Sequence, residues 1–127
     1  MTLMTDRQRQ SAFAEFVLEQ MADISGVSKR AMFGGFGIYR DGLMFALIAD
    51  EDLYFKANDW LADEFVARAL PPFVFESKGK AMALKYYRAP ESVFEDAEQM
   101  KLWADKAYLC ALRNIAGKKT KPRNMPA

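Results

Sequence analysis

Three apolar runs lie between residues 30 and 56 and are separated by two turn signals, Asp41-Gly42 and residues 50–52. Asp-Gly between apolar runs favours a β-hairpin, because a type I′ turn needs a positive φ at both central residues. The pattern predicts a three-stranded antiparallel meander. Its first strand includes Gly34-Gly35-Phe36-Gly37, although glycine weakens a strand and needs a compensating contact.

Strand register decides which side chains share a face of this meander. A two-residue first loop places Ile38 opposite Phe45. The same register pairs Phe36 with Leu47, and a three-residue second loop pairs Leu47 with Phe55. These large apolar side chains predict one buried face. The second face then carries Tyr39, Met44, Ile48, Tyr54 and Lys56.

Three further stretches carry apolar residues at helical spacing and predict amphipathic helices. Gly26 and Gly117 are the predicted C-terminal stops of the first and the last helix, because glycine readily adopts the conformation that ends a helix. The predicted helices span residues 6–24, 58–70 and 96–116.

Between the second and third helices, residues 73–75 and 81–88 are apolar runs on either side of a polar turn, and they predict a second hairpin. The whole pattern predicts an α+β domain of two layers, with a five-stranded antiparallel sheet and helices in the order α-βββ-α-ββ-α. Residues 1–117 form this single domain. Residues 118–127 form a basic tail that we expect to be disordered.

Histidine is absent from the 127 residues, and one cysteine is present. The absence of histidine excludes Ser-His-Asp and Cys-His nucleophile pairs, histidine general bases and histidine-ligated zinc. Cys110 falls on the last predicted helix, where we interpret it as a small core residue. We therefore expect no catalytic residue, no cofactor and no metal. Chemistry based on carboxylates or lysines is the enzymatic alternative.

The net charge of +1 is unevenly distributed along the chain. Lys118, Lys119, Lys121 and Arg123 contribute four positive charges, so residues 1–117 carry −3. No apolar run approaches about 20 residues, the length of a membrane span. The first residues lack a signal-peptide core, and a single cysteine leaves no intrachain disulfide. These features predict a cytoplasmic protein that does not enter a membrane.

Four motifs combine these elements: R-A-M-F-G-G-F-G-I-Y from Arg30, G-L-M-F-A-L from Gly42, L-Y-F-K from Leu53 and Y-R-A-P-E from Tyr87. Together they resemble the N-terminal domain of the TfoX/Sxy family of competence regulators, over about residues 10–116. The resemblance implies an antiparallel sheet with helices in the order above, and no enzymatic activity. The resemblance implies a role in transcription, because full-length members of this family look like bacterial transcriptional co-regulators that act with a cyclic-AMP receptor protein. We expect a stand-alone form of their first domain.

The second sheet face is the candidate site of a regulatory or adaptor protein that binds another protein. Its aromatic side chains are of the kind found at interfaces. The expected partner is either part of the transcription machinery or a second copy of the chain, as a homodimer. The alternative is that the last helix covers this face. The candidate partner-binding residues are Tyr39, Met44, Ile48, Tyr54, Lys85 and Tyr87.

Gly35 and Gly37 fall on this second face in the predicted register and leave a shallow trough beside Tyr39. We expect an aromatic side chain to fill the trough, either Trp103 or Tyr108 of the last helix or a side chain of a second subunit. The alternative explanation for the glycines is a bulge or a bend in the strand.

The basic tail supports a second hypothesis, weak nucleic-acid binding. Its four cations can neutralise phosphates, and such binding is salt-sensitive and independent of base sequence. The alternative is a solvated terminus without a partner. The candidate nucleic-acid residues are Lys118, Lys119, Lys121 and Arg123.

Overall fold

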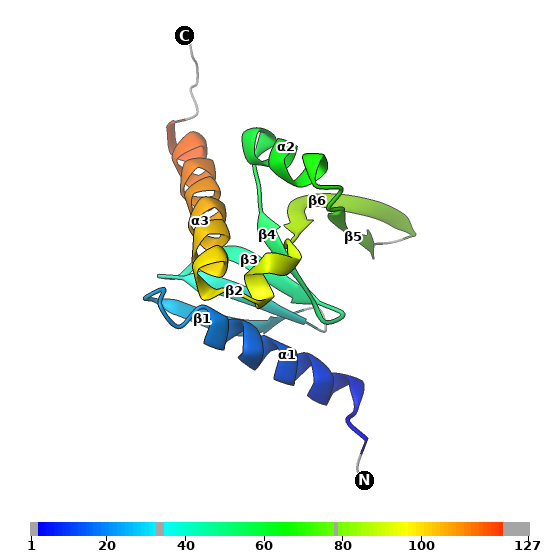
Figure 1. The fold of residues 1–127 in the computed structure, drawn as a ribbon. Helices are drawn as coiled ribbons and strands as arrows, with labels where there is room; N and C mark the ends of the chain where they lie inside the picture. The colour runs from blue at the N-terminus through cyan, green and yellow to red at the C-terminus, as the bar shows by residue number, and fades with distance from the viewer. Residues whose placement is uncertain (1–2, 33–34, 78, 121–127) are drawn as a thin grey trace.

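The computed structural model describes residues 3–32, 35–77 and 79–120, with the side chains of residues 76–77, 81–84 and 116–120 excepted. In this part of the chain, one antiparallel sheet of six strands has the spatial order β1-β2-β3-β4-β6-β5, and three α-helices accompany it (Figure 1). The elements are α1 (Asp6–Gln20), β1 (Val27–Met32), β2 (Gly35–Arg40), β3 (Leu43–Ala49), β4 (Asp52–Lys56), α2 (Asp59–Ala67), β5 (Pro72–Ser77), β6 (Lys80–Arg88), the short 3-10 helix η1 (Glu91–Phe94) and α3 (Ala97–Thr120).

The predicted α+β class and antiparallel sheet are confirmed, but the predicted number of five strands is wrong. The additional strand is β1, which pairs with β2 at one edge of the sheet. Three of its six residues, Ser28, Lys29 and Arg30, are polar, and its side chains are exposed or only partly buried. An edge strand of this kind lacks the apolar alternation by which a strand is predicted. Phe33 and Gly34, from the glycine motif, lie outside the described residues.

A β-bulge in β3 changes the predicted register between β2 and β3. Close to the loop, Tyr39 pairs with Met44, as a two-residue loop requires. Beyond that pair Ile38 faces Ala46 instead of Phe45, and Phe36 faces Ile48. Phe45 is the extra residue of the bulge. The predicted pairs of Ile38 with Phe45 and of Phe36 with Leu47 are therefore wrong.

The loop between β3 and β4 is also shorter than predicted. Ala49 pairs with Asp52, so the loop has two residues, Asp50 and Glu51. Both adopt positive φ values, 51° and 62°, which is the geometry of a type I′ turn. Neither is glycine, so the sequence carried no strong signal for this turn. The shorter loop pairs Leu47 with Tyr54 rather than with Phe55.

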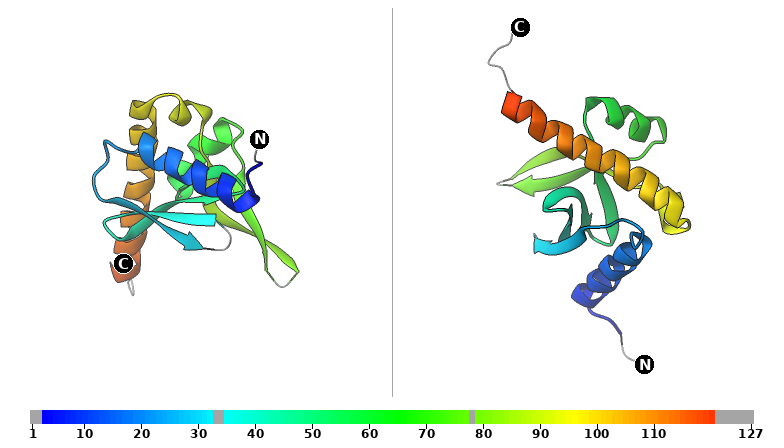
Figure 2. Two further views of the ribbon diagram at one scale, coloured as in Figure 1. Left: turned by 90° about the horizontal axis from the view of Figure 1, so that it is seen from below. Right: turned by 90° about the vertical axis from the view of Figure 1, so that its left-hand side faces the viewer.

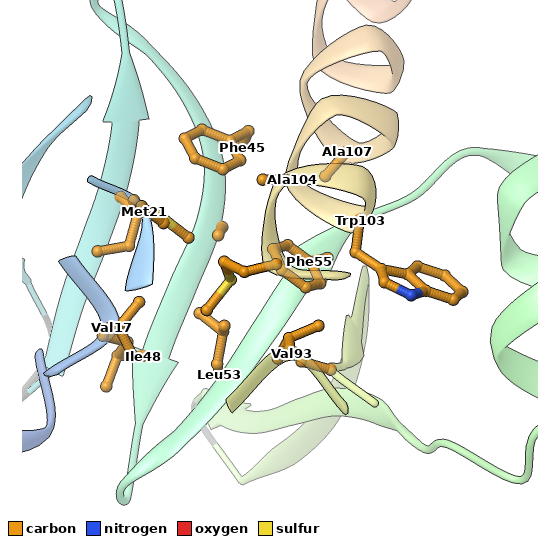
Figure 3. Packing of buried hydrophobic residues seen from close by; sticks show 14 of the residues in the cluster. Val17, Met21, Phe45, Ile48, Leu53, Phe55, Val93, Trp103, Ala104 and Ala107 are labelled. Carbon is orange, nitrogen blue, oxygen red and sulfur yellow. The ribbon is translucent and has the colours of Figure 1, made fainter. Parts of the chain in front are cut away.

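The core lies between one face of the sheet and the helices. Phe45, Ile48 and Phe55 point from this face, and each is at most 1% exposed. Figure 3 shows Val17 of α1 and Met21, which directly follows α1, beside the strands, with Ile48 next to Val17. On the same face, residues of α3 and α2 belong to the same buried cluster. All three α-helices therefore contribute to a single core.

Local capping explains where α1 and α2 begin. Thr5 caps α1, because its hydroxyl accepts from the Gln8 N–H at 3.1 Å while the Gln8 side chain accepts from the Thr5 N–H. Asn58 caps α2 by accepting from the Leu61 N–H at 2.8 Å. The buried positions of these helices are Ala14 and Val17 in α1, and Leu61 and Phe65 in α2.

The last helix is longer than predicted. It continues through Gly117 to Thr120, so Gly117 does not end it. Cys110 is 2% exposed within the core cluster, which confirms its interpretation as a core residue, and burial raises the pKa of its thiol. The helix buries mostly small residues against the sheet, with two larger ones at its start: Met100, Trp103, Ala104, Ala107 and Ala111.

Phe45→Ala tests the core assignment. Phe45 is fully buried, so we expect a loss of about 3–5 kcal/mol in the free energy of unfolding, measured with urea. The matched control is Phe75→Ala, because Phe75 is 36% exposed; its expected cost is below about 1.5 kcal/mol. Equal costs for the two variants would contradict the assignment.

Gly35→Ala tests the close approach of β2 and β3. A Cβ atom at Gly35 would overlap the backbone carbonyl oxygen of Ile48, so we expect a destabilisation of about 1–3 kcal/mol by the same assay. Gly42→Asn is the control, since Gly42 has open space and a φ of 84° that asparagine tolerates. A Gly35→Ala protein as stable as the control would mean that β2 and β3 are farther apart.

Candidate functional site

The second face of the sheet carries no helix among the described residues. The core cluster contains residues of the opposite face and of all three α-helices, but none from this one. The β5 and β6 hairpin projects beyond the helices (Figure 2). We call this surface the uncovered face. By strand register it consists of Ser28, Arg30, Met32, Gly35, Gly37, Tyr39, Met44, Leu47, Ala49, Asp52, Tyr54, Lys56, Phe73, Phe75, Tyr86 and Arg88.

A single cross-strand row runs through the middle of the uncovered face. Arg30 of β1 pairs with Gly37 of β2, and Gly37 pairs with Leu47 of β3. Leu47 then pairs with Tyr54 of β4, which pairs with Arg88 of β6. The row therefore begins and ends with an arginine and has an apolar centre, where Leu47 is 5% exposed.

Two cations of the uncovered face lie over tyrosine rings. The Arg30 guanidinium carbon is 4.8 Å from the centroid of the Tyr39 ring, and the Lys56 ammonium is 5.0 Å from that of Tyr86. Such contacts are attractive, because the face of an aromatic ring carries negative electrostatic potential. The rings therefore hold positive charges in fixed places on this surface.

An aromatic strip continues from the centre of the face to the edge strand β5. The Tyr54 and Phe73 rings meet edge to face with centroids 5.1 Å apart. Phe73 in turn stacks on Phe75 at 6.2 Å. Phe75 is 36% exposed, so the strip reaches solvent. These three rings make an apolar surface next to the charged row.

The trough expected at Gly37 is already filled, although not by the residues we predicted. A Cβ atom there would lie 2.8 Å from the Met32 sulfur, 3.0 Å from the Tyr39 ring and 3.3 Å from the Met44 sulfur. Trp103 packs against Phe65 instead, in the core. Tyr108 likewise contacts Phe45 of the core. The alternative that the last helix covers this face is therefore wrong, because α3 lies on the opposite side of the sheet.

Partial burial alters the acidity of two tyrosines on this face. Burial, together with the nearby Tyr39, raises the pKa of Tyr86 to about 12. Burial also raises the pKa of Tyr54, with a further contribution from the Asp52 carboxylate. Tyr39 is on β2 and Tyr86 on β6, three strands away in the sheet order. The twist of the sheet therefore brings side chains of distant strands close to one another.

Three of the six predicted partner-binding residues lie on the uncovered face. Tyr39, Met44 and Tyr54 are there and are partly exposed. Ile48 is not: the bulge and the shorter loop turn it into the core, where it is 1% exposed. The predicted placement of Ile48 on the second face is therefore wrong.

The other two candidates lie on the helix side of the sheet. Tyr87 stacks on Phe65 of α2, with ring centroids 5.4 Å apart. Lys85 is exposed and forms an ion pair with Asp59 at the start of α2. The sequence shows that Lys85 and Tyr87 alternate with Tyr86 along β6. It does not show which of the two alternating groups faces the helices. A contact of any of the six residues with a partner stays a prediction.

The sequence missed several residues of this face for identifiable reasons. Arg30 and Met32 belong to β1, which the hydrophobic pattern did not separate from β2. Leu47 was placed in the core by the predicted register. Tyr86 and Arg88 did have a signal, because their alternation with Tyr87 in β6 marks one face of a strand.

The predicted nucleic-acid residues fall at the limit of the described chain. Lys118 and Lys119 lie on the last turn of α3, with side chains outside the described set. Lys121 and Arg123 lie outside the described residues altogether. The tail hypothesis therefore stays a prediction.

Within residues 3–32, 35–77 and 79–120, no three histidine, cysteine or carboxylate side chains gather where a metal could bind. Among the side chains whose burial the structure describes, no charged residue is buried as a whole, although the Nε atom of the half-buried Arg40 is. None of the helices in the described part of the chain is long and apolar enough to span a bilayer.

Comparison with known proteins identifies a family that matches most of the chain. The model of the TfoX N-terminal domain matches residues 19–111, a range that contains all six strands. Protein Sxy of Escherichia coli (strain K12) is 24% identical over 105 residues, which are 83% of this chain and 50% of that protein. The chain thus spans about half the length of this curated relative.

Tyr86→Phe tests the environment of the uncovered face. The folded state raises the pKa of Tyr86 from 10.0 to about 12, so it favours the protonated phenol. The unfolded chain releases this proton first, and stability falls as pH rises from about 10 to about 12. We expect urea unfolding between pH 9 and 11 to show a smaller loss of stability in Tyr86→Phe than in the wild type. Equal losses of stability in the variant and in the wild type would show that the Tyr86 hydroxyl is exposed to water.

Proposed function

The chain belongs to the TfoX N-terminal domain family, and from this membership we propose that it is a regulatory protein that acts by binding another protein. Transcriptional control of the kind associated with competence is the proposed process, and the cytoplasm is the proposed location. The proposed role involves no catalysis. The chain spans about half the length of Protein Sxy. Any function that needs the whole of that protein is therefore proposed for this chain and is not inferred from the match alone.

The uncovered face is the single observation that carries this proposal. Tyr54, Phe73 and Phe75 present adjoining rings on it, and the arginines Arg30 and Arg88 flank its central row. Aromatic residues, methionine and arginine are the residue types enriched at protein interfaces. A sheet face with this composition, over which the described part of the chain places no helix, is favourable for a partner, because binding removes the rings from water.

The helix side of the sheet serves a different purpose in this proposal. Its side chains form one close-packed core, which gives the strands a rigid base. Interfaces built on rigid elements lose little conformational entropy when a partner binds. The core side therefore sets the geometry, and the uncovered face makes the contact.

Loss of the gene followed by complementation tests the regulatory role. We expect deletion to change the transcript levels of a defined gene set at least twofold, because a regulator is missing, and the wild-type chain to restore them. The double variant Tyr54→Ala with Phe73→Ala should fail to restore them, because it removes the central ring pair of the uncovered face. Transcript sequencing and the cellular level of each variant are the measurements.

Trp60→Ala is the matched control for this experiment. Trp60 is an aromatic residue of α2 that is 60% exposed, on the helix side, so its loss should leave complementation intact. A deletion without reproducible transcript changes would overturn the regulatory role. Full complementation by the double variant would remove the uncovered face as its site.

A further inference from the structure

We propose that the uncovered face binds an acidic segment of the partner protein, whose carboxylates pair with Arg30 and Arg88 and whose apolar side chains pack on Tyr54 and Phe73. This inference rests on the proposed function, and it adds the chemistry of the partner. It follows from the charge, the order and the spacing of the side chains on this face.

The strands of the face carry more cations than carboxylates, whereas the domain as a whole is negative. By register its described side chains include Arg30, Lys56 and Arg88 and one carboxylate, Asp52. Asp50 and Glu91 also act on the Arg88 end, so the positive charge is strongest toward Arg30. Residues 1–117 as a whole carry −3. The positive region is therefore confined to part of the surface, and a partner with negative charge would be directed to it.

The two arginines of the central row are held in place before any partner binds. Arg30 lies over the Tyr39 ring, and the Arg88 Nη2 atom is 2.7 Å from the Asp52 Oδ1 atom. A guanidinium group has five N–H donors, so the contact with Asp52 leaves Arg88 with donors for a second carboxylate. Side chains that are already ordered lose less entropy on binding.

The row also gives the spacing of the expected carboxylates. Arg30 and Arg88 lie on β1 and β6, which are separated by β2, β3 and β4. Four interstrand spacings amount to about 19 Å along the sheet, and the twist makes this an upper limit for the direct distance. An extended chain covers such a distance in about six residues. The partner segment would therefore carry two acidic residues up to about six positions apart, with apolar residues between them.

The same charges argue against a second copy as the occupant. A symmetric dimer through this face would bring the surface against itself. Arg30 and Arg88 would then approach the same two cations of the other subunit. Repulsion between like charges at an interface costs several kcal/mol. The face therefore favours a different, acidic molecule over a homodimer.

Nucleic acid is a poorer match to this surface than an acidic protein segment. Single strands bind by stacking bases on open aromatic faces. Here Arg30 covers a face of Tyr39, and Lys56 covers a face of Tyr86. The net negative charge of residues 1–117 would also repel a long polyanion more than a short segment with two carboxylates.

Binding of three probes to the full chain tests the proposal. The first is a twelve-residue peptide with two glutamates six positions apart and leucine and phenylalanine between them. The second replaces both glutamates with glutamine, and the third is a twelve-nucleotide oligothymidylate. We expect the acidic peptide alone to shift the amide NMR signals of β1, β4, β5 and β6, which carry Arg30, Tyr54, Phe73 and Arg88, and its affinity to fall as salt is added.

Charge reversal locates the binding site. Arg30→Glu should weaken binding of the acidic peptide about tenfold, because attraction becomes repulsion. Arg113→Glu is the matched control: Arg113 is also an exposed arginine, 5.9 Å from the ring of Trp60, but on the helix side. Its effect should stay within about twofold of the wild type.

Each other outcome overturns the proposal. Equal binding of the glutamine peptide would show that the site is apolar, and tighter binding of oligothymidylate would show that it takes nucleic acid. Absence of binding by the acidic peptide would also refute it. If Arg30→Glu complements the gene deletion like the wild type while the Tyr54 and Phe73 double variant does not, the acidic partner is refuted and the proposed function stands.

Discussion

The bulge at Phe45 determines which side chains of the central strand meet the helices. It places Phe45, Ala46 and Ile48 in the core, all at most 1% exposed, and leaves Met44 and Leu47 on the other face. A shift of one residue exchanges the two faces of a strand, and β3 lies between β2 and β4 in the sheet. Without the bulge, the strand beyond Phe45 would turn Leu47 toward the helices, and neither face would have its observed composition.

The uncovered face exposes apolar side chains to water, but charged side chains lie among them. Its rings are covered in part by cations, as at Tyr39 and Tyr86, and Leu47 is nearly buried beneath its neighbours. Charged groups on a sheet oppose unspecific association between copies. The same groups are available to a partner of opposite charge. The charges that oppose association between copies are thus the same ones that the proposed acidic partner would contact.

Sequence patterns predicted the helices, both hairpins and the α+β class, because each has a local signal. Tyr39 and Met44 were placed on the correct face, since the Asp41-Gly42 turn sets their register directly. Ile48 was misplaced, because a bulge and a turn formed by Asp50 and Glu51 have no comparable signal. The site combines residues of strands that are distant in the sequence, so its charge pattern could not be seen before the strand order was known.

The edge strand β1 gives the uncovered face one of its two terminal arginines while adding little to the core. Its side chains are exposed or half-buried, and none of them is among the buried core residues. Segments with few buried contacts open at lower free energy than the core does. Opening of β1 would separate Arg30 from Tyr39 and from the row that ends at Arg88, yet leave the helices packed on β2, β3 and β4. In the proposed complex, affinity for the acidic segment depends on how well this edge strand stays paired, and a partner that binds across the row would in turn hold β1 in the sheet.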